Sequence, residues 1–196
     1  MRIFRILILF VFPFLILASA GVLFFLNQTR SALSVYGDFP DFSLTSQTGK
    51  EVGASNLKGR PFVASFIFTR CQGQCPIITA QMNRLEREVK GLQLVSFSVD
   101  PEFDSPAVLS QYARHFNADP GRWLFLTGAR DVLNRVTTGL HMNKIDDPMF
   151  HSASLVLADS KGKVRGYYDA NDAERVEKLK RDAGGLMKKT NLLFLS

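Results

Sequence analysis

Pro61-Phe-Val-Ala-Ser-Phe-Ile-Phe-Thr69 is an almost unbroken apolar run that leads directly into Arg70-Cys71-Gln-Gly-Gln-Cys75-Pro76. Apolar runs of this length are typical of a strand that is covered on both faces of its sheet. Pro76 suits the first turn of a helix, where a backbone N–H has no partner within the helix. The stretch therefore predicts a buried strand, a loop with two cysteines, and a helix.

Strand and helix patterns alternate on both sides of this stretch. Before it, Phe39–Leu44 is typical of an edge strand, with a return strand that starts at Glu51. After it, we expect a helix through Val89 that Gly91 ends, a strand over 92–99, a helix capped by Asp104 or Ser105 that runs through Phe116, a strand over 123–126, a helix over 131–140, a hairpin of 154–158 with 164–168, and a last helix over 172–186. This order predicts an α/β domain with a thioredoxin-like fold. Open sheets of this class bind ligands at the carboxyl ends of central strands, where the cysteine loop falls.

A long apolar segment lies near the N-terminus. Ile6–Leu26 contains 21 residues without a charge. At about 1.5 Å per residue, a helix of this length spans the roughly 30 Å hydrocarbon core of a bilayer. Arg2 and Arg5 precede it, so the positive-inside rule leaves the N-terminus in the cytoplasm. Ala18-Ser19-Ala20 leaves a cleavable signal peptide as the alternative, although the apolar run continues beyond this point.

These features predict a single-pass protein of the cell inner membrane. We expect a transmembrane anchor over 1–26, a linker over 27–37, and one domain over 38–196 that lies in the periplasm or outside the cell. The chain has 24 Lys and Arg against 18 Asp and Glu, for a net charge of +6. No basic stripe is interleaved with aromatic residues, which argues against nucleic acid as a partner. A basic surface facing an anionic membrane or an acidic protein explains the charge equally well.

Cys71 and Cys75 are the only cysteines, so they form a reactive pair and not a disulfide scaffold. Cys75 stands at the start of a helix, whose free N–H groups and macrodipole favour a thiolate. Arg70 adds a positive charge beside Cys71. We therefore expect lowered pKa values for both thiols, which would serve soft-metal binding and disulfide exchange equally. Three residues separate the cysteines, one more than in redox enzymes of the thioredoxin type, which leaves room for a metal between the sulfurs.

Two sulfur ligands suit monovalent copper, and a third, imidazole ligand would let the site hold divalent copper as well. The chain has three histidines: His115 in an amphipathic helix, His141 after a helix end, and His151 in a loop that enters a buried strand. Position alone favours a structural role for each of them. Met149 is a soft thioether near His151, and it is either an auxiliary copper ligand or a packing residue.

Three motifs, in order, resemble the Sco/SenC family of copper proteins. They are Cys71-Gln-Gly-Gln-Cys75-Pro76, then Asp100-Pro-Glu-Phe-Asp104, and then His151-Ser152 just before a strand, followed by the turn Asp159-Ser-Lys-Gly162. The likeness covers about residues 38–180. It implies a thioredoxin fold, copper bound by Cys71, Cys75 and His151, and delivery or reduction at the binuclear copper site of a cytochrome c oxidase subunit.

The chain departs from the family pattern close to the expected site. Arg70 replaces a common histidine, Gln72–Gln74 lacks an acidic residue, and Phe150 replaces an acidic residue before the histidine. Fewer negative charges disfavour divalent copper. We therefore hypothesise that the protein prefers Cu(I) to Cu(II), or that it leans toward thiol chemistry.

Three functions remain open from the sequence. The first is a metallochaperone, which binds copper and passes it on without turnover. The second is a thiol-disulfide oxidoreductase that uses Cys71 and Cys75 to reduce the cysteines of the acceptor copper site. The third is a peroxidase with Thr69 beside its reactive cysteine, which the rest of the chain fits less well. Asp100 and Asp104 are either helix-capping residues or groups for acid–base work or partner docking.

Overall fold

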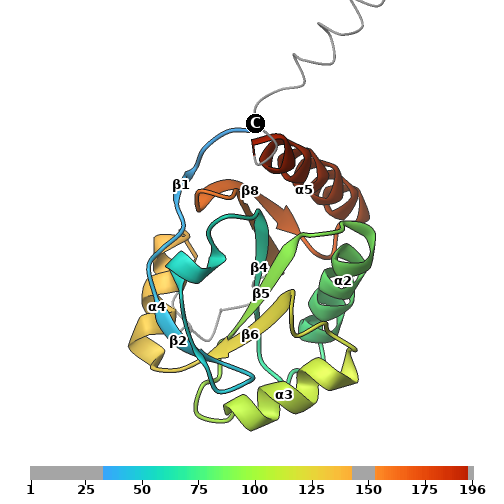
Figure 1. Cartoon of the computed structure of the whole chain (residues 1–196). Helices are drawn as coiled ribbons and strands as arrows, with labels where there is room; N and C mark the ends of the chain where they lie inside the picture. Colours follow the sequence, from blue (N-terminus) through green and yellow to red (C-terminus); the bar gives the residue numbers. More distant parts are fainter. Residues whose placement is uncertain (1–32, 143–152, 194–196) are drawn as a thin grey trace, which may run out of the picture. The chain divides into compact units, whose positions relative to one another are not determined.

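An eight-stranded mixed sheet forms the centre of the computed structural model, which describes residues 33–142 and 153–193 (Figure 1). The residues from Ser34 onward form one compact unit. The strands follow the order β1-β8-β7-β4-β5-β6-β2-β3 across the sheet, with bounds β1 Gly37–Asp38, β2 Ser43–Ser46, β3 Glu51–Gly53, β4 Phe62–Ile67, β5 Gln93–Ser98, β6 Trp123–Thr127, β7 Ser154–Ala158 and β8 Lys163–Asp169.

The middle of the sheet combines parallel and antiparallel neighbours. β4 runs parallel to β5, which runs parallel to β6, whereas β7 lies antiparallel on the other side of β4. β7 and β8 form the expected hairpin, whose turn is closed by the Asp159 carboxylate accepting hydrogen bonds from the N–H groups of Lys161 and Lys163. The thioredoxin-like α/β fold predicted from the sequence is therefore confirmed.

Helices cover both faces of the sheet (Figure 1). α4 packs on one face, and α2, α3 and α5 lie on the other. Their bounds are α2 Gln74–Glu88, α3 Pro106–His115, α4 Arg130–Gly139 and α5 Ala173–Leu193, and a short 3-10 helix, η1, covers Ala54–Leu57. Gly91 follows the end of α2 with a φ of 81°, a conformation that glycine adopts without strain.

All six residues of β4 are buried, as its apolar sequence predicts. Phe62, Ala64 and Phe66 join the core cluster beneath α4. Since successive side chains of a strand point to opposite faces, Val63, Ser65 and Ile67 face α2 and its neighbours. The central strand is thus fixed from both sides, which gives the loop after it a rigid base.

Some element boundaries differ from those expected. The strand expected from Phe39 begins at Ser43, because Phe39 and Phe42 place their rings in the core cluster. The prediction that it is an edge strand is wrong, since β2 pairs with both β6 and β3. β1 and η1 are too short to show a periodic pattern of hydrophobic residues, so the sequence did not predict them. α5 continues beyond the expected end at Leu186 to Leu193. The expected membrane anchor lies outside the described residues. Within residues 33–142 and 153–193, no helix is long and apolar enough to span a bilayer.

A small polar network crosses the buried centre of the sheet. Ser65 and Ser96 are paired across β4 and β5, with 2.8 Å between their hydroxyl oxygens. The indole Nε1–H of Trp123, which is fully buried, donates to the Ser96 hydroxyl at 3.0 Å. Each of these polar groups therefore has a partner in an environment where an unpaired group is costly.

Replacing Ser96 with alanine should lower the free energy of unfolding by about 1–3 kcal/mol, because the Trp123 N–H would lose its acceptor in the core. Urea unfolding followed by tryptophan fluorescence measures the change. Ser55→Ala, at an exposed position, is the matched control and should change stability by less than about 0.5 kcal/mol. Equal losses for the two variants would show that the network contributes nothing.

Candidate metal centre

The two cysteines lie where β4 meets α2. The chain leaves β4 at Ile67, turns with the Cys71 N–H donating to the Phe68 carbonyl at 3.2 Å, and enters α2 at Gln74. Cys75 is the second residue of that helix and Pro76 the third, so the predicted position of Pro76 in the first turn is confirmed. Both thiols therefore stand at the carboxyl end of a central parallel strand, the usual ligand position in open α/β sheets.

The two thiols differ in exposure. Cys75 is 5% exposed, whereas Cys71 is only partly buried, and both are free. The two thiols lie close enough for each to shift the pKa of the other, and the Phe68 N–H donates to the Cys75 sulfur at 3.5 Å. The pair is therefore pre-arranged with one sulfur reachable from solvent and one beneath it.

The thiols also differ in acidity. Partial burial opposes ionisation of Cys71, but hydrogen bonds from Cys75 and from the N–H groups of Gly73 and Gln74 outweigh it and lower the pKa of this thiol. Burial raises the pKa of Cys75 to about 12, and the negative charges of Cys71 and Asp104 add to the increase. The sequence-based expectation of a lowered pKa at Cys75 is wrong, because desolvation outweighs the effect of the helix N-terminus.

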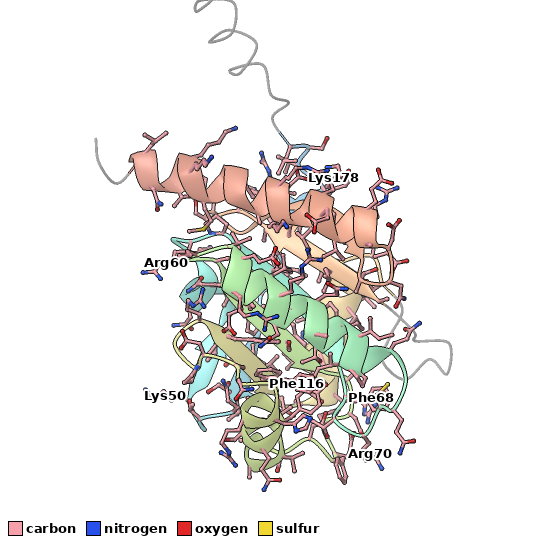
Figure 2. All side chains as sticks on the ribbon, turned by 90° about the vertical axis from the view of Figure 1, so that its right-hand side faces the viewer. Lys50, Arg60, Phe68, Arg70, Phe116 and Lys178 are labelled. Carbon is pink, nitrogen blue, oxygen red and sulfur yellow. The ribbon has the colours of Figure 1, made fainter. Side chains whose placement is uncertain are left out.

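Arg70 interacts with Asp100 and Phe103, and it is not among the groups that lower the pKa of Cys71. Its guanidinium pairs with the Asp100 carboxylate at 2.5 Å and lies 4.4 Å from the centre of the Phe103 ring. Figure 2 shows Arg70 and Phe68 at the same end of the domain. The lowered pKa of Cys71 comes from backbone N–H groups and the Cys75 thiol, so the expected contribution of Arg70 is replaced by an ion pair and a cation–π contact that fix this side chain.

Asp104 is fully buried and binds the start of the cysteine loop. Its carboxylate accepts hydrogen bonds from the Thr69 N–H at 3.2 Å, the Thr69 hydroxyl at 2.5 Å and the Ser98 hydroxyl at 2.6 Å. Ser105 caps α3 instead, since its hydroxyl accepts the Val108 N–H. The motif spacing singled out Asp104, but it could not distinguish a helix cap from this buried link between the ends of β4 and β5.

Two of the three histidines, His115 and His141, lie within the described residues. His115 lies against the Phe116 ring in α3, and His141 follows the end of α4 with a φ of 56°. Across residues 33–142 and 153–193, no three His, Cys, Asp or Glu side chains gather in an arrangement that could hold a metal ion. His151 and Met149 lie outside the described residues, so the expected three-ligand site remains a prediction.

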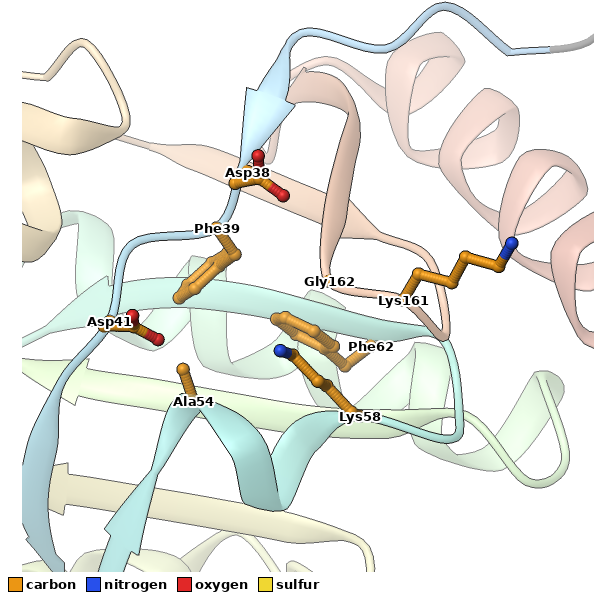
Figure 3. A pocket seen from close by; sticks show the side chains of 8 residues that line it. All are labelled: Asp38, Phe39, Asp41, Ala54, Lys58, Phe62, Lys161 and Gly162. Atoms are coloured by element: carbon orange, nitrogen blue, oxygen red, sulfur yellow. The ribbon is translucent and has the colours of Figure 1, made fainter.

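A pocket of about 140 Å³ lies at the opposite end of β4, beside Phe62 (Figure 3). Asp38, Asp41, Lys58 and Lys161 are among the residues that line it. Its lining contains no cysteine, histidine or methionine, so it offers no soft-metal ligand.

The fold and the site define a thioredoxin-like protein with an asymmetric dithiol at the start of α2. Residues 35–184 match the SCO1/SenC family model, and the chain belongs to this family. It is 33% identical to the SCO1 protein homolog of Bacillus subtilis over 65% of this chain and 72% of that protein.

Solved structures give the same assignment. BsSco, described as a member of the Sco family of cytochrome c oxidase assembly proteins with a disulfide switch, is similar with a TM-score of 0.68 and 27% identity, over 81% of this chain and 99% of that one. ScoI of Bradyrhizobium japonicum, solved with copper bound, is similar with a TM-score of 0.55 and 25% identity, over 74% and 98% of the two chains.

The unequal acidity of the thiols predicts unequal alkylation, because the thiolate is the reactive form. In the folded protein, iodoacetamide should modify Cys71 first, with a rate that rises with pH until the lowered pKa of this thiol is passed. Cys75, with a pKa of about 12, should react only slowly below pH 9. Timed labelling followed by peptide mass spectrometry measures both rates. Equal rates in the folded protein would contradict the assigned asymmetry.

Asp104→Ala should lower the free energy of unfolding by about 3 kcal/mol, because it leaves the two Thr69 donors and the Ser98 hydroxyl without their acceptor. Chemical denaturation of the reduced protein measures this loss. Ser105→Ala is the neighbouring control, and loss of its cap should cost about 1 kcal/mol. A loss at Asp104 no larger than the one at Ser105 would refute the role of the buried carboxylate.

Proposed function

We propose that this protein is a membrane-anchored copper chaperone that delivers copper to the binuclear copper site of a cytochrome c oxidase subunit. Cys71, Cys75 and His151 would bind the ion, with Cu(I) preferred to Cu(II). The observation that carries the proposal is the pair of free thiols that influence each other's acidity at the carboxyl end of β4. Two adjacent sulfur ligands select a soft, monovalent ion.

The direction of β7 supports His151 as the third ligand. β7 runs antiparallel to β4, with Phe62 opposite Ala158 and Ala64 opposite Val156. The first residue of β7, Ser154, therefore lies toward the carboxyl end of β4, at the same end of the strands as the start of the cysteine loop. Three residues of chain span at most roughly 10 Å, and we infer that His151 uses this reach to bring its imidazole to the thiols.

The relatives support the same role. ScoI of B. japonicum was solved with copper bound, and BsSco is described as belonging to a family of oxidase assembly proteins. Because this chain has the three motifs of the family, we include copper binding and a role in oxidase assembly in the proposal. The predicted anchor over Ile6–Leu26 would keep the domain at the membrane where oxidase subunits are assembled.

Transfer would proceed by exchange of ligands. The exposed Cys71 is the first sulfur that a partner's thiol reaches, and the buried Cys75 would release the ion last. Because each incoming ligand replaces one that leaves, copper is never without ligands. Both cysteines must be reduced for this step, so formation of a Cys71–Cys75 disulfide would prevent binding.

A second candidate function follows from the asymmetry of the thiols. In a thiol-disulfide oxidoreductase, the Cys71 thiolate would attack a disulfide of the acceptor and form a mixed disulfide. Cys75 would then attack the Cys71 sulfur, release the acceptor as a dithiol, and leave Cys71–Cys75 oxidised. The two electrons pass from this pair to the acceptor, and a thiol reductant would be needed to restore it.

Anaerobic titration of the reduced protein with Cu(I), against a chromophoric competitor, tests the leading proposal. The wild type should bind one ion per chain, and His151→Ala should weaken binding at least about tenfold because one of three ligands is lost. His141→Ala is the control and should bind as the wild type does. A stoichiometry near zero for the reduced wild type would eliminate the chaperone.

The same variants separate the two functions. Dithiol exchange by Cys71 and Cys75 should survive in His151→Ala, because the imidazole takes no part in it. If His151→Ala bound Cu(I) as tightly as the wild type while Cys71→Ser abolished exchange with a disulfide substrate, the oxidoreductase would be favoured.

A further inference from the structure

The exposed large apolar side chains of the described residues fall into two groups at opposite ends of the domain. Ile77 and Phe103 flank the cysteine loop, whereas Val35, Tyr36 and Leu192 lie at or near α5. Figure 2 shows the labelled Arg70 and Lys178 at these opposite ends. The first group borders the site already described, so the second group needs a separate explanation.

The outer face of α5 is basic. The helix contains six Lys and Arg against three Asp and Glu, a net charge of +3. Lys178, Arg181, Lys188 and Leu192 are all exposed, and their spacing of three, seven and four residues places them on one stripe of the helix. The opposite stripe is buried and includes Leu179, Ala183 and Leu186. The helix therefore presents cations and one large apolar side chain to solvent.

Much of this charge is not neutralised within the protein. Lys178 pairs with Asp182, and Lys180 pairs with Glu88 and Glu177. Among the described residues, no ion pair engages Arg181, Lys188, Lys189 or Lys90, the last of which lies just after α2. Four cations on one surface repel one another, which makes an anionic partner favourable.

A shallow groove of about 550 Å³ runs between the end of α2 and α5. Lys90, Lys180, Arg181 and Lys188 contribute to its walls, together with the apolar side chains of Val89 and Met187. Glu88 is the one acidic residue in the lining, and it is already bonded to Lys180 and Arg84. A phosphodiester headgroup with adjacent apolar groups matches this lining.

The start of the domain lies beside the same helix. Tyr36 packs edge-on against Tyr167 of β8, and the hydroxyl of the next residue, Tyr168, donates to Asp182 of α5. Figures 1 and 2 both show the first described residues next to α5. The described part of the chain therefore begins on the α5 side of the domain.

We propose that the α5 face, defined as Lys90, Arg181, Lys188, Lys189 and Leu192, binds anionic phospholipid headgroups and turns the Cys71–Cys75 loop away from the membrane. The positive charge of the α5 face favours an anionic surface, and the predicted N-terminal anchor would keep the domain close to the membrane. Val35 and Tyr36 add apolar contacts of the kind found at the water–lipid interface. This proposal is independent of copper binding, because it uses none of the proposed ligands.

The domain from Ser34 onward is suited to the test, because its sheet and core use only residues of this unit. Flotation with phosphatidylcholine vesicles, with and without phosphatidylglycerol, measures binding without the anchor. We expect binding only to the vesicles that contain phosphatidylglycerol, and loss of binding at high salt. Arg181→Glu/Lys188→Glu should weaken binding at least about tenfold.

Lys50→Glu/Arg114→Glu is the matched control, because it changes the net charge equally but lies on the β2–β3 turn and on α3. It should bind as the wild type does, and thermal melts should show all variants folded. No binding by the wild type, equal binding to neutral vesicles, or an equal loss in the control would each overturn the proposal. The first of these results would instead assign the basic face to an acidic protein.

Discussion

The buried carboxylate of Asp104 determines how the cysteine loop leaves the sheet. A carboxylate without solvent contact is costly unless each oxygen is hydrogen-bonded, and here the Thr69 N–H, the Thr69 hydroxyl and the Ser98 hydroxyl meet that need. These bonds join the ends of β4 and β5 and fix the position of Thr69. Cys71 follows two residues later, so the cysteine loop starts from a fixed residue. Asp104 also contributes to the asymmetry of the thiols, because its charge adds to the effect of burial in raising the pKa of Cys75.

The domain places different chemistry at its two ends. One end carries the thiols, with the Arg70–Asp100 pair and the Phe103 ring beside them. The other carries α5, whose basic face lies next to the first described residues. Such a division suits a protein that must be held at a surface and still exchange a bound ion with a partner. It also explains a basic chain that lacks the features of nucleic-acid binding.

Most of the fold could be predicted because the decisive signals are local. The apolar run of β4, the hairpin turn at Asp159–Gly162 and the position of Pro76 each depend on neighbouring residues, and all three are confirmed. The prediction of a lowered pKa for Cys75 was wrong. The start of a helix can be predicted from sequence, whereas the burial that raises this pKa depends on the whole fold. The role of Asp104 could not be predicted for the same reason, since its partners come from two other segments. Short elements such as β1 and η1 leave no period to detect.

The central claim is that two sulfurs and one imidazole nitrogen bind a single Cu(I) ion in this protein. X-ray absorption spectroscopy at the copper edge, on the reduced and singly loaded chain, measures the ligand set directly. The account predicts a three-coordinate Cu(I) ion with two sulfur ligands and one histidine nitrogen, and loss of the nitrogen signal in His151→Ala. A spectrum of oxygen and nitrogen ligands alone, or one unchanged in that variant, would contradict it.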